Sequence, residues 1–286
     1  MDQNRTCSIE KEVQKMKEQE WETIQDRLEH YKYTSLHYTD YEEIADYHIV
    51  CRQPELILLL GYHREAKCME YHWAANSPQE LLHGIREREC LLTFIPKEWV
   101  SDLEGQGFTV RCLWQDYFME PLKLGQIPFI SETEMKFLES SECKEASEVT
   151  MSCRGQSRGF TGQTAEWMQE WLQNEEAEDC AVLTEPNEKG EIMGLICTGI
   201  YGRECEEGPI VWIREVAVRP EYQRQGIARK LLMQALSYGK IHGAKRAFLT
   251  ADECNIHAIH LYESIGFRKS EEEGQIDMIR GNEITG

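Results

Sequence analysis

The chain has 286 residues, of which 41% are hydrophobic and 29% are charged, the balance of an ordinary soluble globular protein long enough for two domains. The net charge of −20 and the lack of any long Lys/Arg-rich stretch argue against nucleic acid as a partner. No run of about eighteen apolar residues occurs, and residues 1–5 lack the apolar region of a secretory signal, so we expect a cytoplasmic protein without a membrane span.

Eleven cysteines are scattered singly along the chain. None forms a C-x-x-C pair or a zinc-type spacing with histidine, so we expect reduced thiols and no metal site. Acidic runs are typical of solvated loops and helix faces; the alternative is that some of them line an acceptor site for a cationic amine. These runs are 139–148, 175–179, 204–207 and 271–273.

The first half of the chain predicts a helix followed by alternating strands and helices. Apolar residues recur at helical spacing over 8–32. Strand-like runs follow at 56–62, 69–74, 91–95 and 108–114, with helices at 78–85 and 98–105. The glycines at 105 and 107, directly before Phe108, are typical of a helix end that leads into a strand.

The second half predicts an α/β fold around a mixed central sheet, because antiparallel hairpins come first and crossover helices later. We expect a boundary at Leu124-Gly125, which gives domains 1–125 and 126–286. The predicted order is strand 127–131, helices 140–153 and 163–173, strands 180–184, 192–201 and 210–218, a helix from Gly226 to about Tyr238, a strand near Arg246, a helix around Tyr262 and a strand near Ile276.

The turn Gln223-Arg224-Gln225-Gly226-Ile227-Ala228 joins the strand 210–218 to the long helix that follows. A helix N-terminus has unpaired N–H groups and the positive end of the helix dipole, which suit a phosphate. Gly226 allows the backbone to approach an anion closely, and Ala228 is small enough not to block it. The basic residues near the turn are Arg219, Arg224, Arg229 and Lys230. Taken alone, the glycine could also serve a purely steric turn.

A second motif follows at 255–267, after the strand near Arg246. Ala258, Leu261, Tyr262 and Ile265 share one helix face. Gly266 fits the position that ends such a helix, and Phe267 begins the next strand.

Together the two motifs resemble the GNAT N-acetyltransferase superfamily. The first is similar to its Q/R-x-x-G-x-G/A pyrophosphate loop, and the second to its N-x-x-A-x-x-L-Y-x-x-x-G-F helix. The resemblance covers about 210–267, and it departs from the commonest pattern at Ala228, where a glycine often stands. It implies the GNAT acyl-CoA N-acyltransferase fold for 126–286, with acetyl-CoA (coenzyme A) as cosubstrate.

The resemblance also implies the roles of individual residues. The backbone of Val216, Ala217 and Val218 would bind the pantetheine arm, and the N–H of Val216 or its neighbour would polarise the thioester. Tyr262 would protonate the coenzyme A thiolate, the alternative being an aromatic residue that only packs in the core. Asn255 would join the cofactor site and also suits a helix N-cap. The pyrophosphate would bind at Gln223, Arg224, Gln225, Gly226, Ile227, Ala228 and Arg229.

Glu215 lies at the acceptor end of its strand, and family members often use a carboxylate near this position as general base, sometimes through water. The alternative is a solvated strand residue. The family transfers the acetyl group directly, so no covalent nucleophile is expected.

The unit Trp99 to Phe108 resembles a faded copy of the helix-Gly-Phe unit at 258–267, yet the first half has no phosphate turn. We therefore expect 1–125 to be a degenerate, non-catalytic GNAT-like domain, or an unrelated α/β domain, in tandem with a catalytic 126–286. The expected function is acetyl transfer to a primary amine of a small molecule or peptide. The alternatives are a catalytically weak coenzyme A-binding regulatory protein, and an N-terminal half that delivers a protein substrate.

Overall fold

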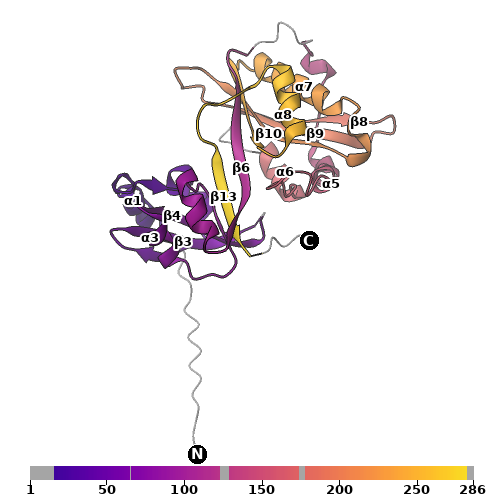
Figure 1. The fold of residues 1–286 in the computed structure, drawn as a ribbon. Helices are drawn as coiled ribbons and strands as arrows, with labels where there is room; N and C mark the ends of the chain where they lie inside the picture. The colour runs from indigo at the N-terminus through magenta and orange to yellow at the C-terminus, as the bar shows by residue number, and fades with distance from the viewer. Residues whose placement is uncertain (1–15, 65, 123–128, 174–177, 282–286) are drawn as a thin grey trace, which may run out of the picture. The chain divides into compact units, whose positions relative to one another are not determined.

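A computed structural model describes residues 16–64, 66–122, 129–173 and 178–281. The chain divides into two compact units, and each is described by itself (Figure 1). Unit 1 comprises Met1–Val110 and Ile276–Gly286, and unit 2 comprises Arg111–Gln275. Within the described ranges, no helix is long and apolar enough to cross a membrane.

Unit 1 is a sheet in the order β2-β3-β4-β5-β13, with the short β1 paired to β4. Strands β3 and β4 are antiparallel, whereas β4 and β5 are parallel. Its helices and strands are α1 (Glu18–Gln25), β1 (Tyr33–Thr34), α2 (Tyr41–Ile44), β2 (His48–Arg52), β3 (Leu56–His63), β4 (Cys68–Ala75), α3 (Pro78–Gly84), β5 (Cys90–Leu92), α4 (Val100–Glu104) and β13 (Gln275–Arg280).

In its described part, the predicted N-terminal helix 8–32 is an α-helix only over Glu18–Gln25. Residues 8–15 lie outside the described residues, and α1 ends at Gln25. The chain then tightens into a 3-10 turn, Leu28–His30, which places Leu28 in the same core as Ile24. Buried residues therefore continue to pack in this core after α1 has ended.

Unit 2 is a mixed sheet in the order β6-β11-β10-β9-β8-β7, in which β10 and β11 are the parallel pair. Its elements are β6 (Phe108–Met119), β7 (Lys136–Phe137), α5 (Cys143–Met151), α6 (Ala165–Leu172), β8 (Glu178–Pro186), β9 (Ile192–Tyr201), β10 (Ile210–Val218), α7 (Ile227–Ile241), β11 (Arg246–Asp252), α8 (Ile256–Ile265) and β12 (Arg268–Lys269). The predicted α/β class with a mixed central sheet is confirmed.

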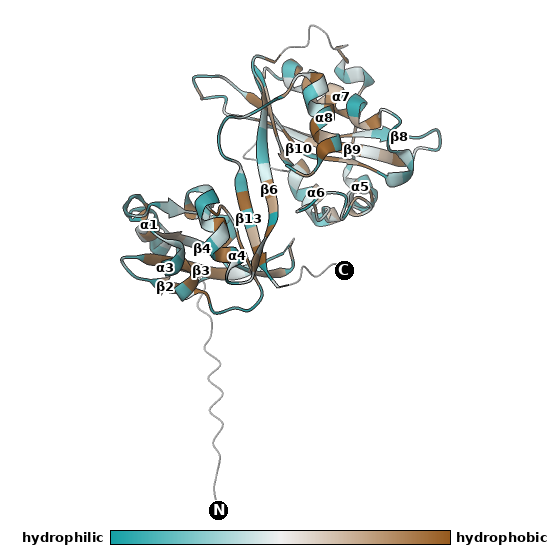
Figure 2. Cartoon of the chain, in the orientation of Figure 1, coloured by the Kyte–Doolittle hydropathy of each residue, from teal (hydrophilic) through white to brown (hydrophobic). Residues whose placement is uncertain are grey.

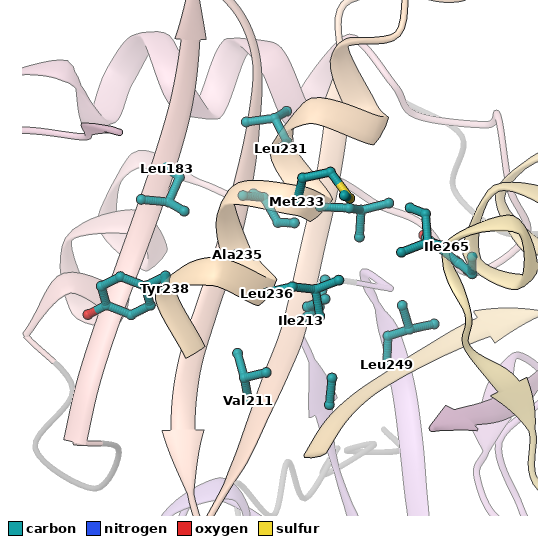
Figure 3. Packing of buried hydrophobic residues seen from close by; sticks show 14 of the residues in the cluster. Leu183, Val211, Ile213, Leu231, Met233, Ala235, Leu236, Tyr238, Leu249 and Ile265 are labelled. Carbon is teal, nitrogen blue, oxygen red and sulfur yellow. The ribbon is translucent and has the colours of Figure 1, made fainter. Parts of the chain in front are cut away.

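Helices cover both faces of this sheet, because alternate residues of its strands enter two different cores. Leu183 of β8 packs with α7, whereas the preceding Val182 packs with α5 and α6. Figure 3 shows the first core, where Leu236 of α7 lies close to Ile213 of β10 and Leu249 of β11 lies nearby. In Figure 2 the hydrophobic colour follows the strands and parts of the helices, and the turns are largely hydrophilic.

The predicted domain boundary at Leu124-Gly125 lies outside the described residues. The compact units change earlier, between Val110 and Arg111 and inside β6. The reason is that β6 pairs with β11 from Trp114 onward, so these residues belong to the sheet of unit 2. Residues 276–281 return to unit 1, where β13 pairs with β5.

The predicted strand 127–131 is wrong in its described part. Residues 129–131 form no strand and lead into a 3-10 turn, Glu132–Glu134. The side chain of Glu134 accepts a hydrogen bond from the N–H of Ser131 at 3.0 Å, which stabilises a helical turn instead of an extended chain.

Candidate active site

Strands β10 and β11 separate where the predicted pantetheine segment begins. Their parallel ladder ends at Ile213 and Leu249, although each strand continues for several residues. Beyond this point β10 keeps its ladder with β9 as its one neighbour among the described strands. The backbone groups on its other edge are therefore placed to pair with a ligand. Val216, Ala217 and Val218 all lie on this segment.

A β-bulge at Arg214 changes which side chains share a face of β10. The register with β9 slips between Ile213 and Glu215. Ile213 packs in the core beneath α7 and α8, and after the bulge Val216 packs against that same core. The guanidinium of Arg214 instead lies 5.8 Å from the ring of Trp167 in α6. The bulge thus places Arg214 and Glu215 together on the α6 face of the sheet.

Glu215 is a buried carboxylate that neighbouring side chains hold by hydrogen bonds. Its side chain is 6% exposed, so the interpretation as a solvated strand residue is wrong. Its Oε1 accepts hydrogen bonds from Gln163 Nε2 at 2.8 Å and from Arg214 Nη1 at 3.0 Å. Gln163 is itself buried and lies just before α6. The carboxylate therefore has a fixed position on the sheet.

Tyr262 lies in the core beneath α8, packed edge to face against Phe267. Its hydroxyl makes no hydrogen bond with any residue that the structure describes. Burial, followed by the negative charge of Glu215, raises the pKa of Tyr262 to about 12. The phenol is therefore protonated at neutral pH and has a proton to donate.

The turn before α7 presents backbone donors to solvent. Gly226 has φ +84 and Arg224 has φ +59, two left-handed residues within three positions. The Gln223 side chain donates to the Val218 carbonyl at 2.9 Å and to Gln156 Oε1 at 2.7 Å, which fixes the turn to the end of β10. No side chain caps α7. The first N–H groups of this helix and its positive dipole end are thus available to an anion.

Two arginines stay beside this turn and contact α8. Arg224 Nη2 lies 3.3 Å from His257 Nε2, and Arg229 Nη2 donates to Ser264 Oγ at 2.6 Å. Both arginines are exposed, and these contacts are with an imidazole and a hydroxyl and not with a carboxylate. Their charge can therefore act on a bound phosphate.

The other two basic residues near the turn, Lys230 and Arg219, have partners outside it. Lys230 forms an ion pair with Glu185 at 2.7 Å, which neutralises its charge. Arg219 donates from Nε to the Ile192 carbonyl at 2.9 Å, toward β9.

The remaining predicted cofactor residues contribute in different ways. The side chain of Ile227 is buried in the core, so only its backbone could contact a ligand at the turn. Ala228 is half-buried. Gln225 is exposed, and its side chain donates a hydrogen bond to the Glu221 carbonyl. Asn255 Oδ1 accepts a hydrogen bond from Ala258 N at 3.3 Å, so the predicted N-cap is confirmed.

Sequence reasoning missed Gln163 and interpreted His257 only as a surface or packing histidine. Gln163 lies in an irregular segment 52 residues from Glu215, and no local pattern marks it. His257 is the second residue of α8, and the proximity of α7 and α8 is what brings it to Arg224. Across the described ranges, no group of three His, Cys, Asp or Glu side chains is placed to hold a metal ion.

Comparisons with known proteins agree with this geometry. Residues 146–267 match the Acetyltransferase (GNAT) family. Mycothiol acetyltransferase of Thermobispora bispora is 33% identical over 81 residues, which are 28% of this chain and 28% of that protein. Spermine/spermidine N(1)-acetyltransferase of Bacillus subtilis is 29% identical over 83 residues, 28% of this chain and 55% of that protein. The chain thus spans about a quarter to a half of the curated relatives it matches.

A solved GCN5-related N-acetyltransferase from Sphaerobacter thermophilus has the same fold, with a TM-score of 0.51 and 16% identity. The match covers 79% of this chain and 80% of that one, more residues than unit 2 contains. These findings define an α/β protein with a GNAT domain over residues 146–267. The resemblance to the GNAT N-acetyltransferase superfamily that the two motifs predicted is thus confirmed for this domain.

Proposed function

We propose that this protein is an N-acetyltransferase that moves the acetyl group of acetyl-CoA directly to a primary amine. The observation that carries the proposal is the separation of β10 from β11 beyond Ile213, with Tyr262 beneath α8 and Glu215 on the α6 face. A thioester placed in this opening would lie between a proton donor and a carboxylate. The GNAT family match over 146–267 supports the same reaction class.

Coenzyme A would bind along a path that the turn and β10 define. Its pyrophosphate would accept hydrogen bonds from the first N–H groups of α7, with Arg224 and Arg229 beside it. Its pantetheine arm would pair with the open edge of β10 at Val216 to Val218. The chain's residues thus hold the cofactor mainly through backbone groups.

The transfer needs one proton removed and one supplied. The amine nitrogen attacks the thioester carbonyl carbon, a C–N bond forms, and the C–S bond breaks. The nitrogen gives up a proton to Glu215, directly or through water, and the departing thiolate takes a proton from Tyr262. A backbone N–H at Val216 would stabilise the charge that develops on the carbonyl oxygen.

Several observations favour an amine acceptor. The net charge of −20 attracts cations, and a protein named spermine/spermidine N(1)-acetyltransferase is among the relatives. Tyr262 is retained, which favours an enzyme over a coenzyme A-binding regulatory protein. We also propose that 1–125 has a non-catalytic role in a tandem arrangement, because the N-terminal half has no counterpart of the Gly226 turn.

The test is thiol release from acetyl-CoA, followed across a panel of polyamines, amino acids, aminoglycosides and N-terminal peptides. Coenzyme A binding is measured in parallel by calorimetry. Amine-dependent thiol release, with acetylated amine identified by mass spectrometry, is expected. Tight binding without amine-dependent release would instead identify a regulatory protein.

A further inference from the structure

The α6 face of the sheet is open to solvent at Thr250 of β11. Helices α5 and α6 pack on β8, β9 and β10, and their core includes Val182, Leu195 and Ala217. Thr250 lies in the middle of the sheet, on β11, yet it is exposed. A central strand can expose a side chain where no helix covers that face. A ligand can therefore reach this part of the sheet.

Three aromatic residues form a row across this open face. Trp212 of β10 is opposite Phe248 of β11, and Phe248 is opposite Phe118 of β6. Their ring centroids are 6.5 Å and 5.0 Å apart, and all three side chains are half-buried. Aromatic faces of this kind attract ammonium groups and the methylenes next to them.

The next row on the same face is polar. Asp116 of β6 is opposite Thr250 of β11, one step along from the aromatic row, and Glu215 of β10 lies on the far side of β11. Strand β11 lies between β6 and β10, and β10 diverges from β11 beyond Ile213, so the two carboxylates are separated by at least two strand spacings, or about 10 Å. The open face thus has one negative group on each side of Thr250.

The burial of Asp116 and its lack of a described partner are properties expected of a carboxylate that binds a cation. It is half-buried, and its side chain has no hydrogen-bond or ion-pair partner within the part of the chain that the structure describes. Burial, followed by the negative charge of Glu272, raises the pKa of Asp116. An ammonium group bound here would offset the repulsion between the two carboxylates.

We infer that this face binds an acceptor with two ammonium groups, a linear diamine or longer polyamine. The reacting nitrogen would lie at Glu215, the second ammonium at Asp116, and the methylene chain against Trp212 and Phe248. The inference rests on the proposed acetyltransferase function and specifies its substrate class. An aryl amine would use the aromatic row but would leave Asp116 without a partner, so charge complementarity favours the diamine.

The experiment compares linear diamines with monoamines of the same chain length on the full protein. We expect kcat/KM to be at least about tenfold higher for the diamine of the best length, which corresponds to about 1.4 kcal/mol. Asp116→Asn should raise KM for the diamine by about tenfold and leave KM for the monoamine and the affinity for coenzyme A unchanged. Glu188→Gln, an exposed carboxylate in the turn between β8 and β9, is the matched control and should change neither.

Equal kcat/KM for diamine and monoamine, or an equal effect of Asp116→Asn on both, would overturn the inference and leave the acetyltransferase proposal standing. A preference for aryl amines would also overturn it. Calorimetry of diamine binding to the protein loaded with coenzyme A gives a readout that needs no turnover. Binding that depends on Asp116, without acetyl transfer to any amine, would retain the diamine site and overturn the enzymatic function.

Discussion

The carboxylate of Glu215 lies close enough to Tyr262 that its charge adds to burial in raising the pKa of the phenol to about 12. The two residues come from β10 and α8, 47 positions apart in the sequence, and they approach the opening between β10 and β11 from its two faces. The pair therefore has the arrangement that direct acyl transfer needs, with one group to receive a proton and another to donate one.

Replacing Tyr262 with Phe is expected to lower turnover by about 10²- to 10⁴-fold, because the variant lacks the proton donor for the thiolate. The affinity for acetyl-CoA should change little, since the Tyr262 hydroxyl makes no hydrogen bond with a described residue. Tyr238→Phe is the matched control, because Tyr238 lies in the same core but donates to the Asp179 carbonyl. Turnover of Tyr262→Phe within a factor of two of the parent would show that this tyrosine only packs.

The raised pKa of Tyr262 predicts a loss of stability at alkaline pH. The phenol ionises near pH 10 in the unfolded chain and near pH 12 in the folded protein. Its contribution to stability is therefore complete below pH 10 and is lost as the pH rises through 12. Urea unfolding of the parent and of Tyr262→Phe should diverge by about 2 to 3 kcal/mol over this interval, with the parent losing more. A constant difference between the two would contradict the assignment.

Replacing Gly226 with Val is expected to weaken coenzyme A binding by more than tenfold, or about 1.4 kcal/mol. A Cβ at this position would meet no atom within 4 Å, so the loss comes from the backbone, whose φ of +84 a β-branched residue disfavours. Gly107→Val is the matched control, since Gly107 also has a positive φ and open space but lies in unit 1. Calorimetry showing unchanged affinity in the Gly226 variant would refute the turn as the pyrophosphate site.

Replacing Glu215 with Gln is expected to lower kcat/KM by about 10²-fold with coenzyme A affinity retained, because the amide keeps the shape of the side chain but cannot accept the amine proton. Gln163→Ala tests whether the position of the carboxylate matters, since Gln163 donates a hydrogen bond to Glu215 Oε1. A steady-state assay in which Glu215→Gln keeps parental kcat/KM would remove Glu215 from the reaction.

A fifth prediction concerns the buried carboxylate of Glu70 in unit 1. It accepts a hydrogen bond from Tyr47 at 2.7 Å and lies 3.6 Å from His72. Burial alone would raise the pKa of Glu70, but the hydrogen bond and charge of His72 bring it below the ordinary value. Its contribution to stability is therefore present above about pH 4.5 and is lost as the pH falls through the lowered pKa.

Glu70→Gln should cost about 3 kcal/mol of unfolding free energy at neutral pH, because it removes one partner of a buried pair. Glu42→Gln, at an exposed position in α2, should cost little. The acid-induced loss of stability should be shallower in Glu70→Gln than in the parent. Parallel acid titrations of the two proteins would contradict the pairing.

Elements that depend on consecutive residues could be predicted from local sequence patterns. The turn at 223–228, the strand 210–218 and the helix around Tyr262 were predicted from local spacing and are present in the structure. The reason is that helix periodicity, a glycine at positive φ and an N-cap act within a few residues of each other. The same local signals identified the superfamily.

Features that depend on strand register and on distant partners could not be predicted in this way and are seen only in the folded structure. The bulge at Arg214 places Glu215 beside Gln163, and the pairing of β6 with β11 places Asp116 opposite Thr250 and moves the change of unit to Val110. Alternation along a strand specifies two faces, but not which neighbour it will pair with or where an extra residue interrupts the ladder. These contacts join residues 52 or more positions apart, so they arise when the sheet assembles.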